Sequence, residues 1–263
     1  MRIFIITMDD PVQTYDFIKH IIDKKRHQVV GIAVPNGNRL TLAKGKSKKV
    51  YVLSLLLIMG VFPFIKSANT IFWYRLKKEL HRFGLAKDPS IMGYAKSKGI
   101  PTQRIQTPNG KAFRAHLASL DLDVIINQSQ SFIKQELLDI PKIGVLNRHN
   151  ALLPRNRGRL TPFWVKYHND GETGVSIHFV EASLDSGDII IQKKFPVEST
   201  DTFNTIVKKN YQLAPHAMIE ALDFLEEGKT DFIENDDDQA TYNTTPTFKE
   251  ALDYRMKIRY KRK

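Results

Sequence analysis

Apolar and polar positions alternate in blocks along the first third of the chain. Residues 2–7 (RIFIIT) and 28–34 (QVVGIAV) are dominated by apolar side chains, as expected of strands buried on both faces. Between them, a helix is expected to start at Asp9-Asp10-Pro11 and to continue to about Lys25. A strand, a helix and a second strand in this order indicate a β-α-β unit and therefore a parallel sheet.

The same alternation continues through the rest of the chain. It predicts helices over 90–98, 111–120, 202–227 and around 163–167, and strands over 100–105, 123–127, 143–146, 174–180 and 189–192. We therefore expect an α/β fold with a Rossmann-like, mostly parallel twisted sheet flanked by helices. One catalytic domain is expected over residues 1–230, and a short C-terminal extension over 231–263.

An insertion interrupts this pattern at about residues 38–90. Residues 50–65 (VYVLSLLLIMGVFPFI) are uncharged, but the run is shorter than the ~18 residues of a spanning helix and is broken by Gly60 and Pro63. Lys and Arg border this run and the aromatic residues that follow it, a pattern typical of a helix lying in a membrane interface. We therefore expect a helical insertion with peripheral membrane contact through residues 50–80. Packing on the core or in a homodimer interface is the alternative.

Charge is distributed unevenly. The net charge is +12, yet residues 39–87 carry +10 and residues 254–263 carry +6, which leaves −4 on the remainder. Positive charge confined to two segments favours an anionic partner there and argues against DNA binding over the whole surface. The final ten residues either hold an anionic surface or form a frayed basic terminus.

Composition restricts the chemistry further. The chain has no Cys, which excludes disulfides, thiol nucleophiles and thiolate metal sites. Asp236–Asp238 is interpreted as an exposed acidic turn, so no metal is expected. The N-terminus (MRIFIITMDDPV) becomes acidic too early for a signal peptide. The expected location is the cytoplasm, or its membrane face if the insertion binds lipid.

Three polar residues follow or end predicted strands. Asn147 and His149 are two residues apart on an extended segment, so both side chains leave the same face. Asp185 lies in the turn before the strand at 189–192. An amide that donates to an oxyanion and an imidazole that moves a proton, with a carboxylate to orient the imidazole, would serve a reaction that forms an oxyanion. These three are our candidate catalytic residues.

Four motifs around these residues occur together and in order. They are Asn147-Arg148-His149, the loop Leu152–Gly158 (LLPRNRG), Thr173-Gly174-Val175, and the turn Leu184–Asp188 (LDSGD). In this the chain resembles the formyltransferases that use 10-formyltetrahydrofolate, a group that includes methionyl-tRNA, glycinamide ribonucleotide and sugar-nucleotide N-formyltransferases. The resemblance covers about residues 1–228 and fails in the insertion.

The resemblance implies roles for further residues. It implies 10-formyltetrahydrofolate as co-substrate, bound by the loop after the strand at 123–127 and by the Leu-Asp-x-Gly-Asp turn. The residues implied in folate binding are Gln128, Ser129, Gln130, Ser131, Phe132, Ile133, Leu184 and Gly187. Arg155, Arg157 and Arg159 are the residues expected to meet the diphosphate of an acceptor.

The acceptor is expected to be the primary amine of a nucleotide-linked or lipid-linked amino sugar, in the synthesis of cell-envelope polysaccharide such as lipopolysaccharide. The first loop lacks the Gly-Ser-rich phosphate loop of glycinamide ribonucleotide formyltransferases, and only about 35 residues follow the last core helix, too few for a tRNA-binding domain. A methionyl-tRNA-type enzyme, a formyltetrahydrofolate hydrolase and a non-catalytic membrane- or partner-binding protein on the same scaffold are the alternatives.

Overall fold

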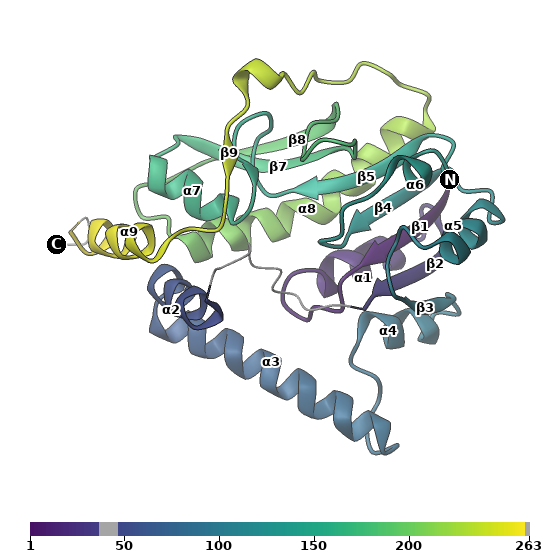
Figure 1. The fold of residues 1–263 in the computed structure, drawn as a ribbon, viewed down its shortest axis with the longest axis horizontal. Helices are drawn as coiled ribbons and strands as arrows, with labels where there is room; N and C mark the ends of the chain where they lie inside the picture. The colour runs from purple at the N-terminus through teal and green to yellow at the C-terminus, as the bar shows by residue number, and fades with distance from the viewer. Residues whose placement is uncertain (37–46, 261–263) are drawn as a thin grey trace.

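The structure is a computed structural model that describes residues 1–36 and 47–260. A seven-stranded sheet forms the centre of the molecule, and Figure 1 shows its arrangement. The strand order is β3-β2-β1-β4-β5-β7-β8. The strands are β1 (Arg2–Thr7), β2 (Gln28–Pro35), β3 (Thr102–Ile105), β4 (Val124–Gln128), β5 (Gly144–His149), β7 (Glu172–Phe179) and β8 (Ile189–Pro196). The first five in the sheet run parallel, β7 is antiparallel to β5, and β8 is antiparallel to β7. The predicted mostly parallel α/β sheet is confirmed.

Helices cover both faces of this sheet. One face packs against α1 (Tyr15–Lys24), α4 (Ile91–Ser97) and α8 (Phe203–Glu226), and the other against α5 (Lys111–Ala118) and α6 (Gln135–Leu138). Helix α1 begins four residues later than the sequence suggested, because Asp10 Oδ1 accepts hydrogen bonds from the backbone of Val12 and Gln13. These bonds hold residues 11–14 in turns.

The insertion forms two helices at the margin of the molecule (Figure 1). They are α2 (Lys48–Met59) and α3 (Val61–Arg82), separated by Gly60 at φ +84°. A glycine tolerates this left-handed φ, so the predicted break at Gly60 is where one helix ends and the next begins. No helix among residues 1–36 and 47–260 is long and apolar enough to cross a bilayer. The start of the predicted insertion, at residues 38–46, lies outside the described residues.

The C-terminal extension returns to the body of the molecule. After the 3-10 turn η1 (Asp237–Gln239), β9 (Tyr242–Asn243) pairs in parallel with β6 (Arg157–Gly158). Helix α9 (Phe248–Tyr260) then packs Ala251 and Tyr254 against α2 and α7 (Thr161–His168). The basic C-terminal segment is therefore helical up to Tyr260 and is anchored by the buried Tyr254, which contradicts the interpretation of this part as a frayed terminus.

Candidate active site

The parallel strands β4 and β5 bring two amide side chains together at their carboxyl ends. Gln128 ends β4, and its Nε2 donates to Asn147 Oδ1 over 2.9 Å and to the Asn127 carbonyl over 2.9 Å. Both side chains lie at the carboxyl ends of the parallel strands, where open α/β folds bind ligands. The bond from Gln128 fixes the Asn147 amide with its oxygen turned inward, toward the protein.

The nitrogen of the same amide points toward His178 on β7. Asn147 and His178 are direct cross-strand partners, and their Nδ2 and Nε2 atoms are 3.4 Å apart. The His178 Nδ1 lies 2.7 Å from the Phe179 carbonyl, which can only accept, so Nδ1 carries the proton. Burial lowers the pKa of His178 to about 4, and the ring is neutral at pH 7. Its Nε2 lone pair can therefore accept one Asn147 N–H, which leaves the second N–H for a ligand.

His149 is buried, and both of its ring nitrogens face protein groups. Nε2 lies 2.8 Å from the Asn156 carbonyl and donates to it, while Nδ1 lies 3.5 Å from Asp185 Oδ2. Because Nε2 is committed to a carbonyl, only Nδ1 can take up or release a proton. A proton on Nδ1 would lie beside the Asp185 carboxylate, which balances its charge.

Asp185 lies between the two imidazoles. Its Oδ1 is 3.8 Å from His178 Nε2, and its Oδ2 accepts a 2.9 Å hydrogen bond from the Gly158 backbone. The Asp185 carbonyl accepts from Asn235 Nδ2 over 2.8 Å, and this contact comes from the C-terminal extension. The turn and the loop that face the two imidazoles are thus both held by defined hydrogen bonds.

The loop after β5 is completed by the extension. The Asn156 backbone N–H donates to Thr241 Oγ1 over 2.8 Å, and Asn156 Oδ1 accepts from Asn243 Nδ2 over 2.8 Å. A Cβ added to Gly158, which has φ +104°, would come within 2.1 Å of the Asn243 carbonyl. Only glycine allows β9 to approach this closely.

The prediction that Arg157 meets an acceptor diphosphate is wrong. Its side chain is 0% exposed. Its Nη1 pairs with Asp237 at 2.5 Å and donates to the Tyr242 hydroxyl, and its Nη2 donates to Asn235 Oδ1 over 2.9 Å. The guanidinium anchors the extension and has no path to a ligand. Arg155 and Arg159 are exposed.

The residues predicted to bind folate divide into two groups. Gln128 contacts Asn147, Ser129 Oγ donates to Asn127 Oδ1 over 2.7 Å, and Ile133 packs in the core, so these side chains shape the loop. Gln130 is exposed and Ser131 half-buried, and Gly187 is buried under the Phe179 carbonyl. Phe132 and Leu184 are 63% and 61% exposed. Large exposed apolar side chains beside Gln128 and Asp185 are suited to cover a flat aromatic ring system.

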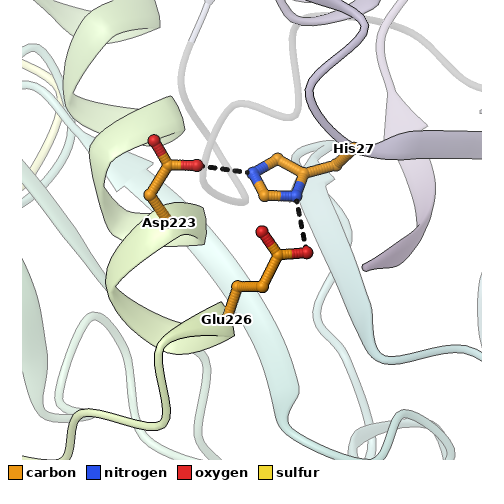
Figure 2. A group of neighbouring side chains, drawn as sticks. All are labelled: His27, Asp223 and Glu226. Carbon is orange, nitrogen blue, oxygen red and sulfur yellow. Dashed lines mark hydrogen bonds and ion pairs between the residues drawn. The ribbon is translucent and has the colours of Figure 1, made fainter.

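A second group of titratable side chains lies at the far end of α8. His27, Asp223 and Glu226 have ligand atoms within 4.8 Å of one another (Figure 2). Asp223 Oδ1 also pairs with Arg26 Nε at 2.5 Å, and Glu226 Oε1 with the N-terminal ammonium of Met1 at 2.7 Å. Because cations already satisfy both carboxylates, this group is an ion-pair cluster that ties β2 to α8.

Sequence reasoning missed His178, Asn156 and Asn235. His178 could have been found from the antiparallel pairing of the strands that became β5 and β7, because His178 and Asn147 then face each other. Asn156 acts through its backbone carbonyl, and any residue type offers that group. Asn235 is 50 residues from Asp185, and no local pattern links the two.

The family model described as Formyl transferase matches residues 79–222. A methionyl-tRNA formyltransferase of Parabacteroides distasonis is 31% identical over 157 residues, which are 59% of this chain and 48% of that protein. The chain thus spans about half the length of the curated relatives it matches.

Solved structures share the fold at low identity. Glycinamide ribonucleotide transformylase 1 from Symbiobacterium toebii has a TM-score of 0.58 at 18% identity and covers 87% of this chain and 88% of its own. An N-formyltransferase from Helicobacter canadensis, in complex with folinic acid and dTDP-3-aminofucose, has a TM-score of 0.55 at 15% identity and covers 93% of this chain and 71% of its own. With its family match over more than half of its length, the chain belongs to the formyl transferase family.

Proposed function

We propose that this protein moves a formyl group from 10-formyltetrahydrofolate to a primary amine. One observation carries the proposal: Asn147 is held by Gln128 and His178 so that one N–H remains for a ligand, next to the His149–Asp185 pair. Membership of the formyl transferase family supports the same reaction. The exposed apolar side chains of Phe132 and Leu184 fit a pterin ring.

The reaction balances without any other reactant. The amine nitrogen bonds to the formyl carbon, and the formyl oxygen takes negative charge and accepts the free N–H of Asn147. His149 Nδ1 takes the amine proton, with Asp185 balancing the charge, and passes it to the folate nitrogen. The bond between the formyl carbon and the folate nitrogen breaks, and the formamide and tetrahydrofolate leave.

The proposed acceptor is the amino group of a nucleotide-linked or lipid-linked sugar. Arg155 and Arg159 remain exposed on the loop after β5 and would meet its phosphates. The structural neighbour from Helicobacter canadensis was crystallised with such a nucleotide sugar, which supports this class. The enzyme would then act in the cytoplasm, on a precursor of envelope polysaccharide.

The activity is tested by release of tetrahydrofolate from 10-formyltetrahydrofolate. Amino-sugar nucleotides, glycinamide ribonucleotide and methionyl-tRNA serve as the acceptor panel. Release with an amino sugar alone is the expected result. Release without any acceptor would indicate a hydrolase instead, and folate binding without release would exclude every acceptor in the panel.

Asn147→Ala tests the central observation. Loss of one oxyanion donor lowers turnover by ~10²–10³. We therefore expect kcat to fall by this factor while folate affinity and melting temperature stay near those of the unaltered protein. Asn69→Ala on α3 provides the matched control, and a near-normal kcat in Asn147→Ala would remove this residue from the mechanism.

A further inference from the structure

Helix α3 presents an apolar stripe to solvent. We define the α3 stripe as Phe62, Ile65, Phe72, Trp73 and Leu76, all of which are exposed, with Phe62 at 87% and Trp73 at 51%. At 100° per residue these five side chains fall within an arc of about 100°. An arc of this width is the face that an amphipathic helix normally buries.

The opposite side of α3 contacts the body of the protein through polar groups. The Tyr74 hydroxyl and Lys78 Nζ both bond to the Asp9 carboxylate, which follows β1. Arg104 Nη2 adds a third contact to Asp9 at 3.2 Å. The inward side of α3 also carries the half-buried Phe64 and Ile71, so the stripe is a second apolar face that points away from the protein. An exposed apolar stripe of this size is typical of an interaction surface.

The charges beside the stripe indicate what it binds. Residues 47–87 carry eight Lys and Arg against one acid, Glu79, and Glu79 is paired with Arg82 at 3.1 Å. On the helical wheel, Lys66 and Lys77 border one side of the stripe, and Arg75 and Arg82 lie toward the other. Apolar and aromatic side chains flanked by cations match the boundary between the acyl chains and the anionic headgroups of a bilayer.

We propose that the α3 stripe docks this protein in the plane of an anionic lipid bilayer. The apolar side chains enter the acyl boundary, and Lys66, Lys77 and Arg75 contact lipid phosphates. Helix α3 does not span the bilayer, in keeping with the absence of a spanning helix among residues 1–36 and 47–260. The proposal concerns binding alone and holds whichever amine the active site uses.

Tryptophan fluorescence tests it directly, because the chain has two Trp residues in opposite environments. Trp73 is half-exposed in the stripe, whereas Trp164 is buried and its Nε1 donates to the Thr244 carbonyl. Vesicles of phosphatidylcholine with phosphatidylglycerol should shift the emission to the blue, and lipids brominated on the acyl chains should quench it. Trp73→Phe should keep vesicle binding and lose both spectral changes.

Co-sedimentation with the same vesicles measures how much the apolar side chains of the stripe and the neighbouring cations each contribute to vesicle affinity. The double change Phe62→Ser with Phe72→Ser should weaken binding at least 100-fold, because each buried aromatic ring is worth about ten-fold or more. The triple change Lys66→Glu, Arg75→Glu and Lys77→Glu should also weaken it at least 100-fold, since each cation near an anionic surface contributes about five-fold. All these positions are solvent-exposed, so folding should persist.

Matched controls lie elsewhere on the surface. Val12→Ser with Ile143→Ser removes two exposed apolar side chains, and Lys24→Glu, Lys96→Glu and Lys208→Glu reverses three exposed charges away from α3. The double control should bind vesicles as the unaltered protein does. The triple control should bind only slightly more weakly, because it lowers the net positive charge of the protein. Control variants as weak as the α3 variants would overturn the docking surface.

Two further results would also overturn the proposal. One is the absence of binding to vesicles containing phosphatidylglycerol at low salt. The other is a concentration-dependent dimer, seen by analytical ultracentrifugation without lipid, that dissociates when Phe62 and Phe72 are changed to Ser. That result would assign the stripe to an interface between two copies of this chain.

Discussion

Arg148 lies between Asn147 and His149 in the sequence, yet its side chain leaves the opposite face of β5. The guanidinium lies 4.6 Å from the ring centre of Phe17 and 5.4 Å from that of Tyr211. Its Nε and Nη1 are buried and have no hydrogen-bond partner within the described part of the chain. Burial lowers the pKa of Arg148 and raises that of Tyr211 to about 12, so the tyrosine offers no counter-charge. A buried cation without an anion destabilises the fold.

Replacing Arg148 by Met should therefore stabilise the protein. The apolar side chain fills similar space and removes the desolvation cost, which outweighs the lost contact with the two rings. We expect the free energy of unfolding to rise by about 1–3 kcal/mol, measured by urea denaturation. Lys24→Met, at an exposed position away from the site, is the control. Unchanged stability combined with a higher KM for the acceptor would instead assign Arg148 to substrate binding.

His178 gives the fold a dependence on pH. Its folded pKa of about 4 lies below the unfolded value of 6.5, so between these two values the unfolded chain binds a proton that the folded chain does not. The contribution of His178 is complete above pH 6.5 and is lost as pH falls toward about 4. His178→Gln, which keeps a hydrogen-bond acceptor, should flatten the decline in melting temperature across this window. A variant whose decline matches that of the unaltered protein would show that other groups cause it.

At the scale of elements, the C-terminal extension and the loop after β5 form one structural unit. Arg157 joins them through Asp237, Asn235 and Tyr242, and β6 pairs with β9. Asn235 in turn holds the carbonyls of Asp185 and Gly187. The geometry of the His149–Asp185 pair therefore depends on residues 235–243.

Arg157→Lys should separate this structural role from ligand binding. Lysine keeps the charge but cannot reproduce the forked contacts to Asp237 and Asn235. The melting temperature should fall by several degrees, in line with a loss of about 2–3 kcal/mol from a broken buried network. The KM for a phosphate-bearing acceptor should stay constant, and a rise in KM at unchanged stability would restore Arg157 to the substrate site. Arg155→Lys is the exposed comparison.

Much of this arrangement of elements could be predicted from the sequence, because apolar periodicity and turn residues are local signals. The strands, the order of motifs and the placement of Asn147, His149 and Asp185 follow from such signals. The burial of Arg157 could not be predicted, because it depends on partners about 80 residues away that have no periodic pattern. Which face of α3 contacts the protein could not be predicted either, because the spacing of apolar residues defines a stripe but not the side on which it lies.

At the scale of the whole molecule, Asp9 is the main polar tie between α3 and the sheet. Burial alone would raise the pKa of Asp9, but hydrogen bonds from Lys78, Tyr74 and Arg104 outweigh it and hold this pKa below its usual value. The contribution of Asp9 to stability is therefore complete above pH 3.8 and is lost as pH falls through the folded pKa.

Asp9→Asn should loosen α3 while the sheet stays intact. The amide cannot neutralise Lys78, so amide hydrogens of residues 61–82 should exchange at least ten-fold faster, measured by mass spectrometry. Exchange in the central strands β1 and β4 should stay unchanged at neutral pH. Asp16→Asn, at an exposed position on α1, is the control. Equal protection of α3 in both variants would mean that apolar contacts near α2 hold the helix alone.

The pairing of β6 with β9 also bears on the order in which the chain is made. Translation delivers Asn147, His149 and Asp185 before residues 235–243, which close the loop around His149. A chain still on the ribosome can assemble its central sheet with Arg157 unpaired and the Asn156 carbonyl unfixed. The arrangement of His149 and Asp185 should therefore become fixed only after residues 235–243 have docked, and the formyl transfer proposed for this site should begin only then.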